Sequence, residues 1–505
     1  MKLEIMDTTL RDGEQTSGVS YTETEKLNIA RVLLDEVKVD RIEIASARVS
    51  EGEFKAVEKV INWAKNAGHI DQIEVLGFVD DRESLNWMYK AGARVMNLLC
   101  KGSEKHCREQ LRHTPEQHIK NIKNSLKNAK EMGISVNIYL EDWSNGMRNS
   151  RDYVYYFIDS LKNENIKRFM LPDTLGILNP DEAYVFCKNL IDKYPNLHFD
   201  FHPHNDYDLA AGNIFMAIKA GVHGVHTTVN GLGERAGNVP LSSVVAIIND
   251  HFKIETGVNE EKLTLVSRLV ESFSGIRIPA NKPIIGDYVF TQTSGIHADG
   301  DSKNQLYFND LLPERFGRVR EYALGKMSGK ASIKNNLEAL GIDLDPEAMK
   351  KVTQRIIELG DKKETITKED LPFIISDVLK SRKIDDKIKV KNFSLSVAEG
   401  LKSVATLKLV IGKKEYEETS NGDGQYDAFM KALWKIYDAL GKKHPVLTDY
   451  LVTMPPGGRT DALVETIITW NYQGRSIKTI GLDPDQTVAA IKATVKMLNI
   501  IENGN

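Results

Sequence analysis

Two histidines separated by one residue are the clearest candidates for metal chemistry in this sequence. His202 and His204 lie in an apolar segment expected to be a β-strand, where residues i and i+2 project from the same face. Asp12 is the natural carboxylate to complete a site with them, and Asn238 offers an amide oxygen. Such nitrogen and oxygen ligands suit Mn²⁺, Mg²⁺ or Zn²⁺ and leave positions for substrate oxygens. The alternative is that both histidines only form local hydrogen bonds at a strand end.

Arg11, the neighbour of Asp12, is the second candidate. A guanidinium beside a divalent metal would be placed to neutralise an oxyanion or an enolate oxygen. An ordinary ion pair with one of the nearby carboxylates is the alternative. The favoured interpretation is a site in which a metal and an arginine act on the same substrate.

Three glycines invite comparison with dinucleotide-binding loops. Gly231, Gly233 and Gly237 have the spacing GxGxxxG, and they follow the last expected strand of the N-terminal region. A Rossmann site has a different spacing and follows the first strand, so this interpretation is rejected. A tight loop that needs unusual backbone dihedral angles is the simpler explanation.

The elements that must position these residues form a repeating pattern. The first half of the chain alternates short apolar runs with amphipathic segments, as repeated βα units do, and Thr22 with Glu25 forms a helix capping box. Eight such units predict an α/β fold, a closed (β/α)8 TIM barrel, because an open doubly wound sheet would carry a phosphate-binding loop after its first strand. The expected strands are Leu3–Asp7, Arg41–Ala45, Ile73–Phe78, Arg94–Leu99, Ser135–Leu140, Arg168–Leu171, Leu197–His202 and Gly224–Val229.

The candidate residues follow the carboxyl ends of these strands. In a TIM barrel, catalytic groups come from those ends and from the loops after them. The first strand runs into Arg11 and Asp12, the fifth ends near Glu141, and the sixth ends at Thr174. The metal candidates of the seventh strand and of the loop after the eighth are therefore expected at the same mouth of the barrel.

Beyond the barrel, expected over residues 1–265, the pattern changes twice. Residues 266–325 are rich in glycine, proline and turn residues, whereas residues 326–385 look helical and run into the charged segment Lys380–Lys389, typical of a linker. Residues 386–505 predict a separate α+β domain of two strand-rich units, each closed by a helix. Its expected elements are the strands Ser394–Val397, Ala405–Val410, Leu447–Met454 and Leu463–Trp470 and the helices Tyr426–Leu440 and Gln486–Leu498.

Composition excludes several classes of function. Hydrophobic residues make up 41% of the 505 residues, and 67 Lys and Arg against 71 Asp and Glu give a net charge of -4, so nucleic acid is not an expected partner. No apolar run is long enough for a membrane span, and no signal-peptide pattern is expected at the N-terminus. Cys100, Cys107 and Cys187 are odd in number and lack CxxC spacing, which favours a reduced, cytoplasmic location.

Four segments resemble the signatures of the isopropylmalate, homocitrate and citramalate synthase family. Three belong to the barrel, namely Asp7–Gln15, His202–Asp206 and Gly231–Asn238, and Gly295–Gly300 resembles an element that the synthases supply after it. The resemblance implies that a lid subdomain, a helical subdomain and an allosteric, dimerisation domain follow the barrel in a homodimer. Pro203 is a departure, because the family usually has a small residue or cysteine there, but proline leaves both imidazoles on one side.

The family resemblance implies a Claisen-type condensation of acetyl-CoA with a 2-oxoacid, followed by hydrolysis of the thioester. A divalent metal would chelate the ketone and carboxylate oxygens of the oxoacid and polarise the carbonyl that is attacked. Arg11 would stabilise the oxygen that gains charge, and Thr174 would hold the substrate carboxylate. The implied metal ligands are Asp12, His202, His204 and Asn238.

Removal of a proton from the acetyl methyl group needs a positioned base. By the same resemblance, Glu141 and His297 share this acid–base work, and Asp299 orients or activates His297. The sequence leaves open which of the two removes the proton. The residues that resemble a coenzyme A contact are Gln305, Leu306 and Tyr307. The tyrosine of this set could equally pack the lid.

Within the family, three segments resemble the members that use pyruvate and serve isoleucine biosynthesis: Arg11–Ser20, Tyr139–Gly146 and Phe290–Gly300. Members that use 2-oxoisovalerate in leucine biosynthesis are the alternative. The residues expected to wall the side chain of the oxoacid are Leu76, Leu99 and Tyr139, at the ends of three neighbouring strands. Bulky groups there leave room for a methyl but not an isopropyl group, unless the leucines only fill the barrel core.

The C-terminal domain resembles the family's amino-acid-sensing domain, and isoleucine is the expected feedback effector. Gly422–Phe429 and Pro455–Val464 resemble its effector-binding loops. A small pocket with a few polar anchors is how amino-acid ligands are held, although the same apolar residues could form only the domain core. The expected effector residues are Tyr426, Asp427, Leu447, Tyr450, Thr460, Val464, Pro484 and Gln486.

Two other functions compete with synthesis. A lyase or aldolase with the same barrel would break carbon–carbon bonds, but the element around His297 and the C-terminal domain favour a synthase. A non-catalytic amino-acid sensor is the second rival, and the intact set of Arg11, Asp12, His202, His204 and Glu141 makes it the weaker one.

Overall fold

The computed structural model describes residues 3–340, 342–361, 366, 368–379, 387–453 and 464–503. The chain forms two compact units. The first contains Met1–Phe290 and Phe308–Arg320, and the second contains Thr291–Tyr307 and Glu321–Asn505. The chain therefore leaves the first unit after Phe290, returns to it briefly, and leaves it again after Arg320.

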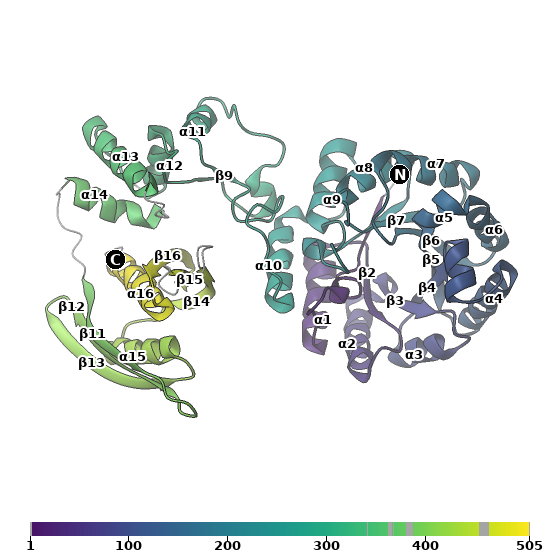
Figure 1. Ribbon diagram of the computed structural model, residues 1–505, viewed down its shortest axis with the longest axis horizontal. Helices are drawn as coiled ribbons and strands as arrows, with labels where there is room; N and C mark the ends of the chain where they lie inside the picture. The colour runs from purple at the N-terminus through teal and green to yellow at the C-terminus, as the bar shows by residue number, and fades with distance from the viewer. Residues whose placement is uncertain are drawn as a thin grey trace. The chain divides into compact units, whose positions relative to one another are not determined.

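The first unit is a closed barrel of eight parallel strands, in which each strand pairs with the next and β8 pairs with β1 (Figure 1). This confirms the predicted (β/α)8 fold. Most strand residues are buried, as expected for strands covered on both faces. The strands are β1 (Glu4–Asp7), β2 (Arg41–Ser46), β3 (Ile73–Phe78), β4 (Val95–Lys101), β5 (Ser135–Glu141), β6 (Ile166–Asp173), β7 (Phe199–Pro203) and β8 (Gly224–Thr227).

Helices surround the barrel strands, and several begin at the caps that the sequence specifies. The capping box of Thr22 and Glu25 opens α1, and similar boxes at Thr114 and Asn179 open α4 and α7. The helices of this unit are α1 (Glu23–Arg31), α2 (Glu51–Ala67), α3 (Glu83–Ala91), α4 (Pro115–Glu131), α5 (Trp143–Asn149), α6 (Arg151–Leu161), α7 (Pro180–Lys193), α8 (Ala210–Ala220), α9 (Leu241–Ile247) and α10 (Leu263–Ser274).

The second unit begins with short strands and helices. Strands β9 (Thr291–Gln292) and β10 (Glu321–Tyr322) pair in parallel, and the helix α11 follows β9. A Cβ atom on Gly295 would lie 2.6 Å from the backbone nitrogen of Gly329, so only glycine lets α11 begin this close to the neighbouring loop. The helices are α11 (Gly295–Ser302), α12 (Lys330–Ala339), α13 (Pro346–Asp361) and α14 (Leu371–Leu379).

The rest of the second unit consists of two similar halves, as predicted. Each is a three-stranded antiparallel sheet followed by a helix. The prediction missed the third strand of each half, and β13 gave no signal because its run KEYEETSNG is almost entirely polar. The elements are β11 (Ile388–Ser396), β12 (Ser403–Ile411), β13 (Lys414–Gly422) and α15 (Gln425–Ala439), then β14 (Val446–Thr453), β15 (Val464–Tyr472), β16 (Arg475–Asp483) and α16 (Gln486–Asn503).

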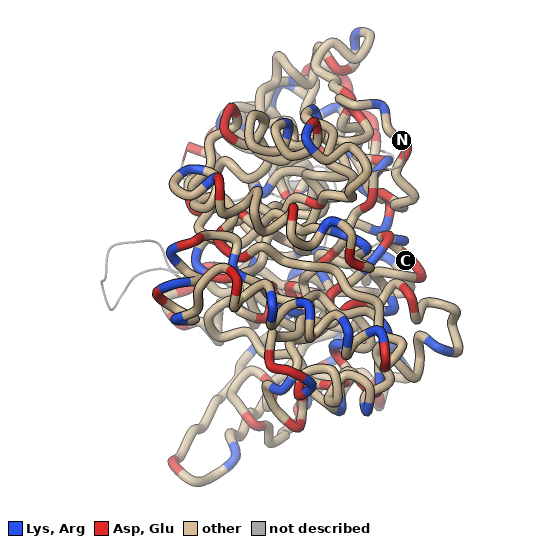
Figure 2. Tube along the Cα trace, turned by 90° about the vertical axis from the view of Figure 1, so that its right-hand side faces the viewer, with Lys and Arg blue, Asp and Glu red and all other residues tan. Residues whose placement is uncertain are grey.

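The charged residues of both signs are interspersed along the chain. Figure 2 shows Lys and Arg next to Asp and Glu without a continuous stripe of one sign. The three cysteines are buried and free. Among the helices that the structure describes, none is both long and apolar enough to span a membrane.

Candidate active site

The structure brings the two histidines and the aspartate of the predicted metal site together. His202 lies in β7, His204 follows that strand, and Asp12 lies in the loop after β1. Asp12 Oδ2 is 3.1 Å from His202 Nε2 and 3.8 Å from His204 Nε2. The imidazole centroids are 5.2 Å apart, so Pro203 does leave both rings on one side. All three side chains are buried, and one ligand atom from each fits within 4.8 Å of the others.

The electrostatics of this triad fit a divalent cation. Burial lowers the pKa of His204 to about 4, so its imidazole is neutral and able to bind a metal. Burial alone would raise the pKa of Asp12, but Arg11 and the two histidines hold that pKa well below its usual range. Within the described part of the chain, Asp12 Oδ1 and Asn238 Oδ1 are buried without a hydrogen-bond partner. A buried carboxylate oxygen and a buried amide oxygen beside two imidazole rings are the ligand types that a divalent metal takes.

A tight glycine loop sets the position of Asn238. A Cβ atom on Gly237, where φ is +80°, would lie 2.0 Å from the carbonyl oxygen of Gly231. The Asn238 backbone donates to that same carbonyl, and its side-chain nitrogen donates to the carbonyl of Leu232 at 3.1 Å. The amide oxygen is left free, and Asn238 forms a β-bridge with His204. The glycines therefore permit the close backbone approach and the positive φ that this tight loop needs.

Arg11 combines the two roles that the sequence left open. Its Nε donates to Glu43 Oε2 at 2.5 Å, which is a buried ion pair. Its other nitrogens lie 3.4 Å from Asp12 Oδ2 and 3.5 Å from the hydroxyl of Tyr139. The guanidinium is thus fixed from behind by Glu43 and faces the metal triad.

The sequence analysis missed Glu43 and the polar residues behind it. Asn97 donates to Glu43 Oε1 at 2.7 Å, and Asn137 donates to Asn97 at 2.8 Å. All three are fully buried and lie inside β2, β4 and β5. The available signal was a single polar residue inside each apolar strand, because a buried polar group needs a partner.

The three predicted wall residues belong to one apolar cluster. Leu76 and Tyr139 are buried with Met6 and Met170, and the half-buried Leu99 packs against them. The two methionines were not predicted from the sequence, although Met170 pairs directly with Tyr139 in the barrel. Thr174 lies after β6, and its hydroxyl accepts a hydrogen bond from the backbone of Asp142 at 2.9 Å.

Glu141 lines a pocket of about 320 Å³ at the ends of β3, β4 and β5. Its carboxylate forms an ion pair with Lys101, which the sequence analysis did not single out. The pocket is lined by Phe78, Val79, Leu99, Lys101, Gln110, Leu111, His113, His118 and Glu141. A predicted wall residue and the predicted acid–base residue therefore share one cavity, whose volume is sufficient for a small ligand.

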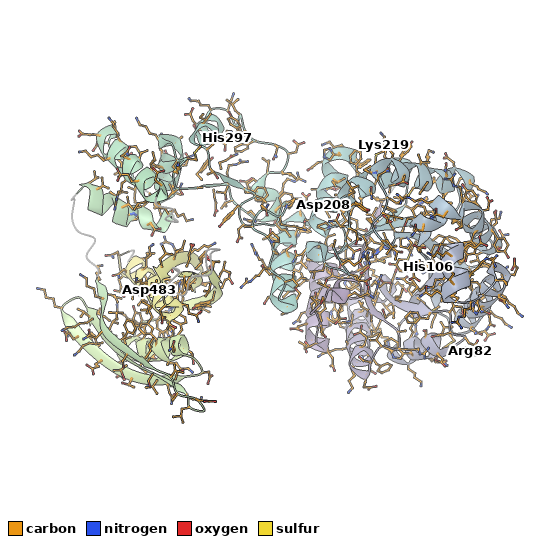
Figure 3. The ribbon with its side chains drawn as sticks, in the orientation of Figure 1. Arg82, His106, Asp208, Lys219, His297 and Asp483 are labelled. Carbon is orange, nitrogen blue, oxygen red and sulfur yellow. The ribbon has the colours of Figure 1, made fainter. Side chains whose placement is uncertain are left out.

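The remaining catalytic candidates belong to the second unit. Figure 3 labels His297, which lies on α11, where its ring packs on Tyr307 with centroids 4.2 Å apart. The carboxylate of Asp299 accepts a hydrogen bond from Lys303 at 2.6 Å, not from His297. Asp299 and His297 lie two positions apart on α11, where side chains do not face each other, and the role of Asp299 in orienting His297 stays a prediction. Tyr307 also packs against Gly300, and the coenzyme A candidates Gln305 and Leu306 precede it.

The structure brings together part of the predicted effector set. The rings of Tyr426 and Tyr450 lie 5.5 Å apart, and the Tyr426 hydroxyl bonds Thr494 at 2.7 Å. The Asp427 carboxylate is engaged by the backbone of Asp423 and by Lys431. Val464 is buried, Leu447, Pro484 and Gln486 are exposed, and Thr460 lies outside the described residues, as do most of the Pro455–Val464 loop and residues 380–386 of the predicted linker.

Comparisons with known proteins cover nearly the whole chain. Residues 2–270 match the HMGL-like family, residues 284–364 match the homocitrate synthase post-HMGL domain-like family, and residues 365–502 match the LeuA allosteric (dimerisation) domain. A putative (R)-citramalate synthase of Methanopyrus kandleri is 33% identical, over 99% of this chain and 96% of that relative. A probable 2-isopropylmalate synthase of the same organism is also 33% identical, over 99% and 98%. The (R)-citramalate synthase of Methanocaldococcus jannaschii is 32% identical over 100% of both chains.

Proposed function

We propose a function from the premise that this chain belongs to the HMGL-like synthase family that includes the citramalate and 2-isopropylmalate synthases, which condense acetyl-CoA with 2-oxoacids. The protein condenses acetyl-CoA with pyruvate and hydrolyses the thioester, which yields (R)-citramalate and coenzyme A. Its place is in isoleucine biosynthesis. The alternative is 2-isopropylmalate synthesis from 2-oxoisovalerate for leucine.

The choice of pyruvate rests on the bulky side chains that are packed beside the metal triad. Both names occur at 33% identity, so similarity alone does not separate them. Tyr139 and Leu76 are buried in one cluster, and Tyr139 contacts both Arg11 and the ring of His202. A bulky phenol this close to the metal triad leaves the space of a methyl group beside the reacting carbonyl.

The residues of the site have distinct tasks in the condensation. Asp12, His202, His204 and Asn238 would hold a divalent cation, which when bound supplies Lewis-acid polarisation of the oxoacid carbonyl. Arg11 donates hydrogen bonds to the ketone oxygen, which becomes an alkoxide as the acetyl methyl carbon bonds to the ketone carbon. Glu141 and His297 share the acid–base work, and one of them accepts a proton from that methyl group. Water then attacks the thioester and releases the coenzyme A thiol.

Comparing 2-oxoacids under identical conditions tests this assignment. Release of the coenzyme A thiol is measured with acetyl-CoA and pyruvate, 2-oxobutyrate, 2-oxoisovalerate or 2-oxoglutarate. We expect pyruvate to have the highest kcat/KM and 2-oxoisovalerate to be at least about 10²-fold poorer, because each misplaced carbon costs about 1–3 kcal/mol. A higher kcat/KM for 2-oxoisovalerate would contradict the pyruvate assignment and support the leucine pathway.

The C-terminal domain is proposed to form the dimer and to sense isoleucine. Its match to an allosteric, dimerisation domain supports this, as do Tyr426 and Tyr450, whose tilted rings lie 5.5 Å apart beside the apolar core of the domain. An effector of this kind must bind two states of the dimer unequally.

Feedback inhibition provides a second test. We expect isoleucine to inhibit the full chain more strongly than leucine does, and Tyr450→Ala to weaken that inhibition at least about tenfold, because a coupling of 1–3 kcal/mol corresponds to a 5–150-fold change in affinity. Activity without isoleucine should be retained. The control is Tyr89→Ala, a 54% exposed tyrosine on α3, which should leave inhibition unchanged. If the wild-type protein turns over normally and ignores both amino acids, the regulatory assignment is wrong.

A further inference from the structure

Behind the site, Tyr139 is the end of a buried chain of hydrogen bonds. Its hydroxyl lies 3.1 Å from His226 Nδ1, and His226 Nε2 lies 3.2 Å from Asp200 Oδ2. Arg41 donates to the same Asp200 oxygen at 2.6 Å and to Glu74 at 2.9 Å. These five side chains come from β5, β8, β7, β2 and β3, and each of them is buried.

The hydrogen bonds from Tyr139 through His226 to Asp200 all have the same donor-to-acceptor direction. The Asp200 carboxylate can only accept, so His226 donates from Nε2 and keeps Nδ1 as an acceptor. The phenol therefore donates to His226 and turns its lone pairs toward Arg11.

The neighbouring barrel residues leave space for the Asp200 carboxylate and hold it in place. A Cβ atom on Gly224 would lie 2.2 Å from Asp200 Oδ1, so glycine at this place in β8 makes room for the carboxylate. His198 donates to Asp200 Oδ1 at 2.8 Å, in addition to the bond from Arg41 at Oδ2. With both oxygens occupied, Asp200 is held in place, and it fixes the tautomer and ring orientation of His226.

We propose that His226, oriented by Asp200, is a positioning residue that fixes the Tyr139 phenol and thereby sets the size limit for the side chain of the oxoacid. The inference rests on the proposed function, because Tyr139 acts as a wall only if the oxoacid binds beside it. A tyrosine held only by packing in a cluster with two methionines would yield to a larger substrate, since methionine side chains adapt readily. The hydrogen bond to His226 prevents that movement.

Two variants of His226 separate its two hydrogen bonds. The amide of asparagine reaches the place of imidazole Nδ1, whereas the amide of glutamine reaches that of Nε2. His226→Asn therefore keeps the acceptor for Tyr139, and His226→Gln keeps the donor to Asp200 but leaves the phenol without its partner. The control is His223→Gln, at the opposite end of β8, where the ring accepts a hydrogen bond from the backbone of Phe199 at 3.2 Å.

The measurement is the ratio of kcat/KM for pyruvate to kcat/KM for 2-oxobutyrate on the metal-loaded full chain. A loss of folded protein lowers both values equally, so the ratio reports the shape of the site alone. We expect the ratio to fall about tenfold in His226→Gln, within the discrimination that one methylene provides. His226→Asn and the control should stay close to the wild-type ratio.

A double variant completes the test. Tyr139→Phe should lower the ratio by itself, and adding His226→Gln to it should have no further effect, because both act through one hydrogen bond. The inference is overturned if His226→Gln keeps the wild-type ratio, if His226→Asn and His226→Gln lower it equally, or if the effect of His226→Gln persists in the Tyr139→Phe background. If the wild-type protein itself prefers a larger oxoacid, the pyruvate assignment fails and the inference fails with it.

Discussion

His204→Ala is expected to remove the bound divalent metal and to reduce kcat by at least about 10³-fold, because a metal supplies several kcal/mol of transition-state stabilisation. Among the described residues, His204 forms a group with Asp12 and His202 whose ligand atoms lie within 4.8 Å of one another, and its Nε2 is 3.8 Å from Asp12 Oδ2. With it removed, Asp12, His202 and Asn238 remain, and only one of them is an imidazole, so we expect the ion to be held too weakly to stay bound. The metal content per protomer is measured by elemental analysis, together with coenzyme A release.

The matched control for this variant is His223→Ala, which also removes a histidine from the β7–β8 region but touches no residue of the triad. It should keep both the metal and the activity. Thermal unfolding of both variants shows whether the barrel survives. Stoichiometric metal in folded His204→Ala would contradict the ligand assignment.

Arg11→Lys is expected to lower kcat about 10²–10³-fold while bound metal is retained, since one preorganised donor to a developing oxyanion contributes this much. Lysine keeps a positive charge beside the buried Glu43, so the fold does not face an unpaired carboxylate. It lacks the planar fork that reaches Asp12 and Tyr139 at the same time. The measurement is kcat and KM for pyruvate at saturating acetyl-CoA, alongside elemental analysis.

Arg48→Lys is the control, because Arg48 follows β2 as Arg11 follows β1, but its side chain is 43% exposed and pairs with Asp80 and Glu83 at the surface. Its kcat should match the wild type. If Arg11→Lys retains the wild-type kcat, Arg11 serves only as the partner of Glu43, which is the structural role that the sequence left open.

The barrel was predictable because each of its strands is a short apolar run between polar loops, and eight of them suffice to close a sheet. The metal triad was predictable for the same reason. His202, His204 and Asp12 follow strand ends, and in a parallel barrel all such ends meet at one mouth.

The polar interior was not predictable by the same reasoning. Glu43, Asp200 and His226 lie within strands that read as apolar, and their partners come from strands far away in sequence. Arg11 and Glu43 meet only because β1 and β2 pair, and Tyr139 and His226 meet only because the barrel closes. A search for isolated polar residues inside expected strands would have found them.

The strand that was missed in the second unit has a local cause. Strand β13 was not predicted because its own residues show no apolar alternation. Its pairing with β12 holds it in the sheet.

The most direct test of the account is identification of the product. The metal-loaded full chain is incubated with pyruvate and acetyl-CoA labelled with ¹³C in both acetyl carbons, and the products are resolved by chiral chromatography with mass spectrometry. The account predicts a single enantiomer, (R)-citramalate, carrying both labelled carbons in an amount equal to the coenzyme A released. Coenzyme A release that yields only labelled acetate, with no five-carbon diacid, would contradict it.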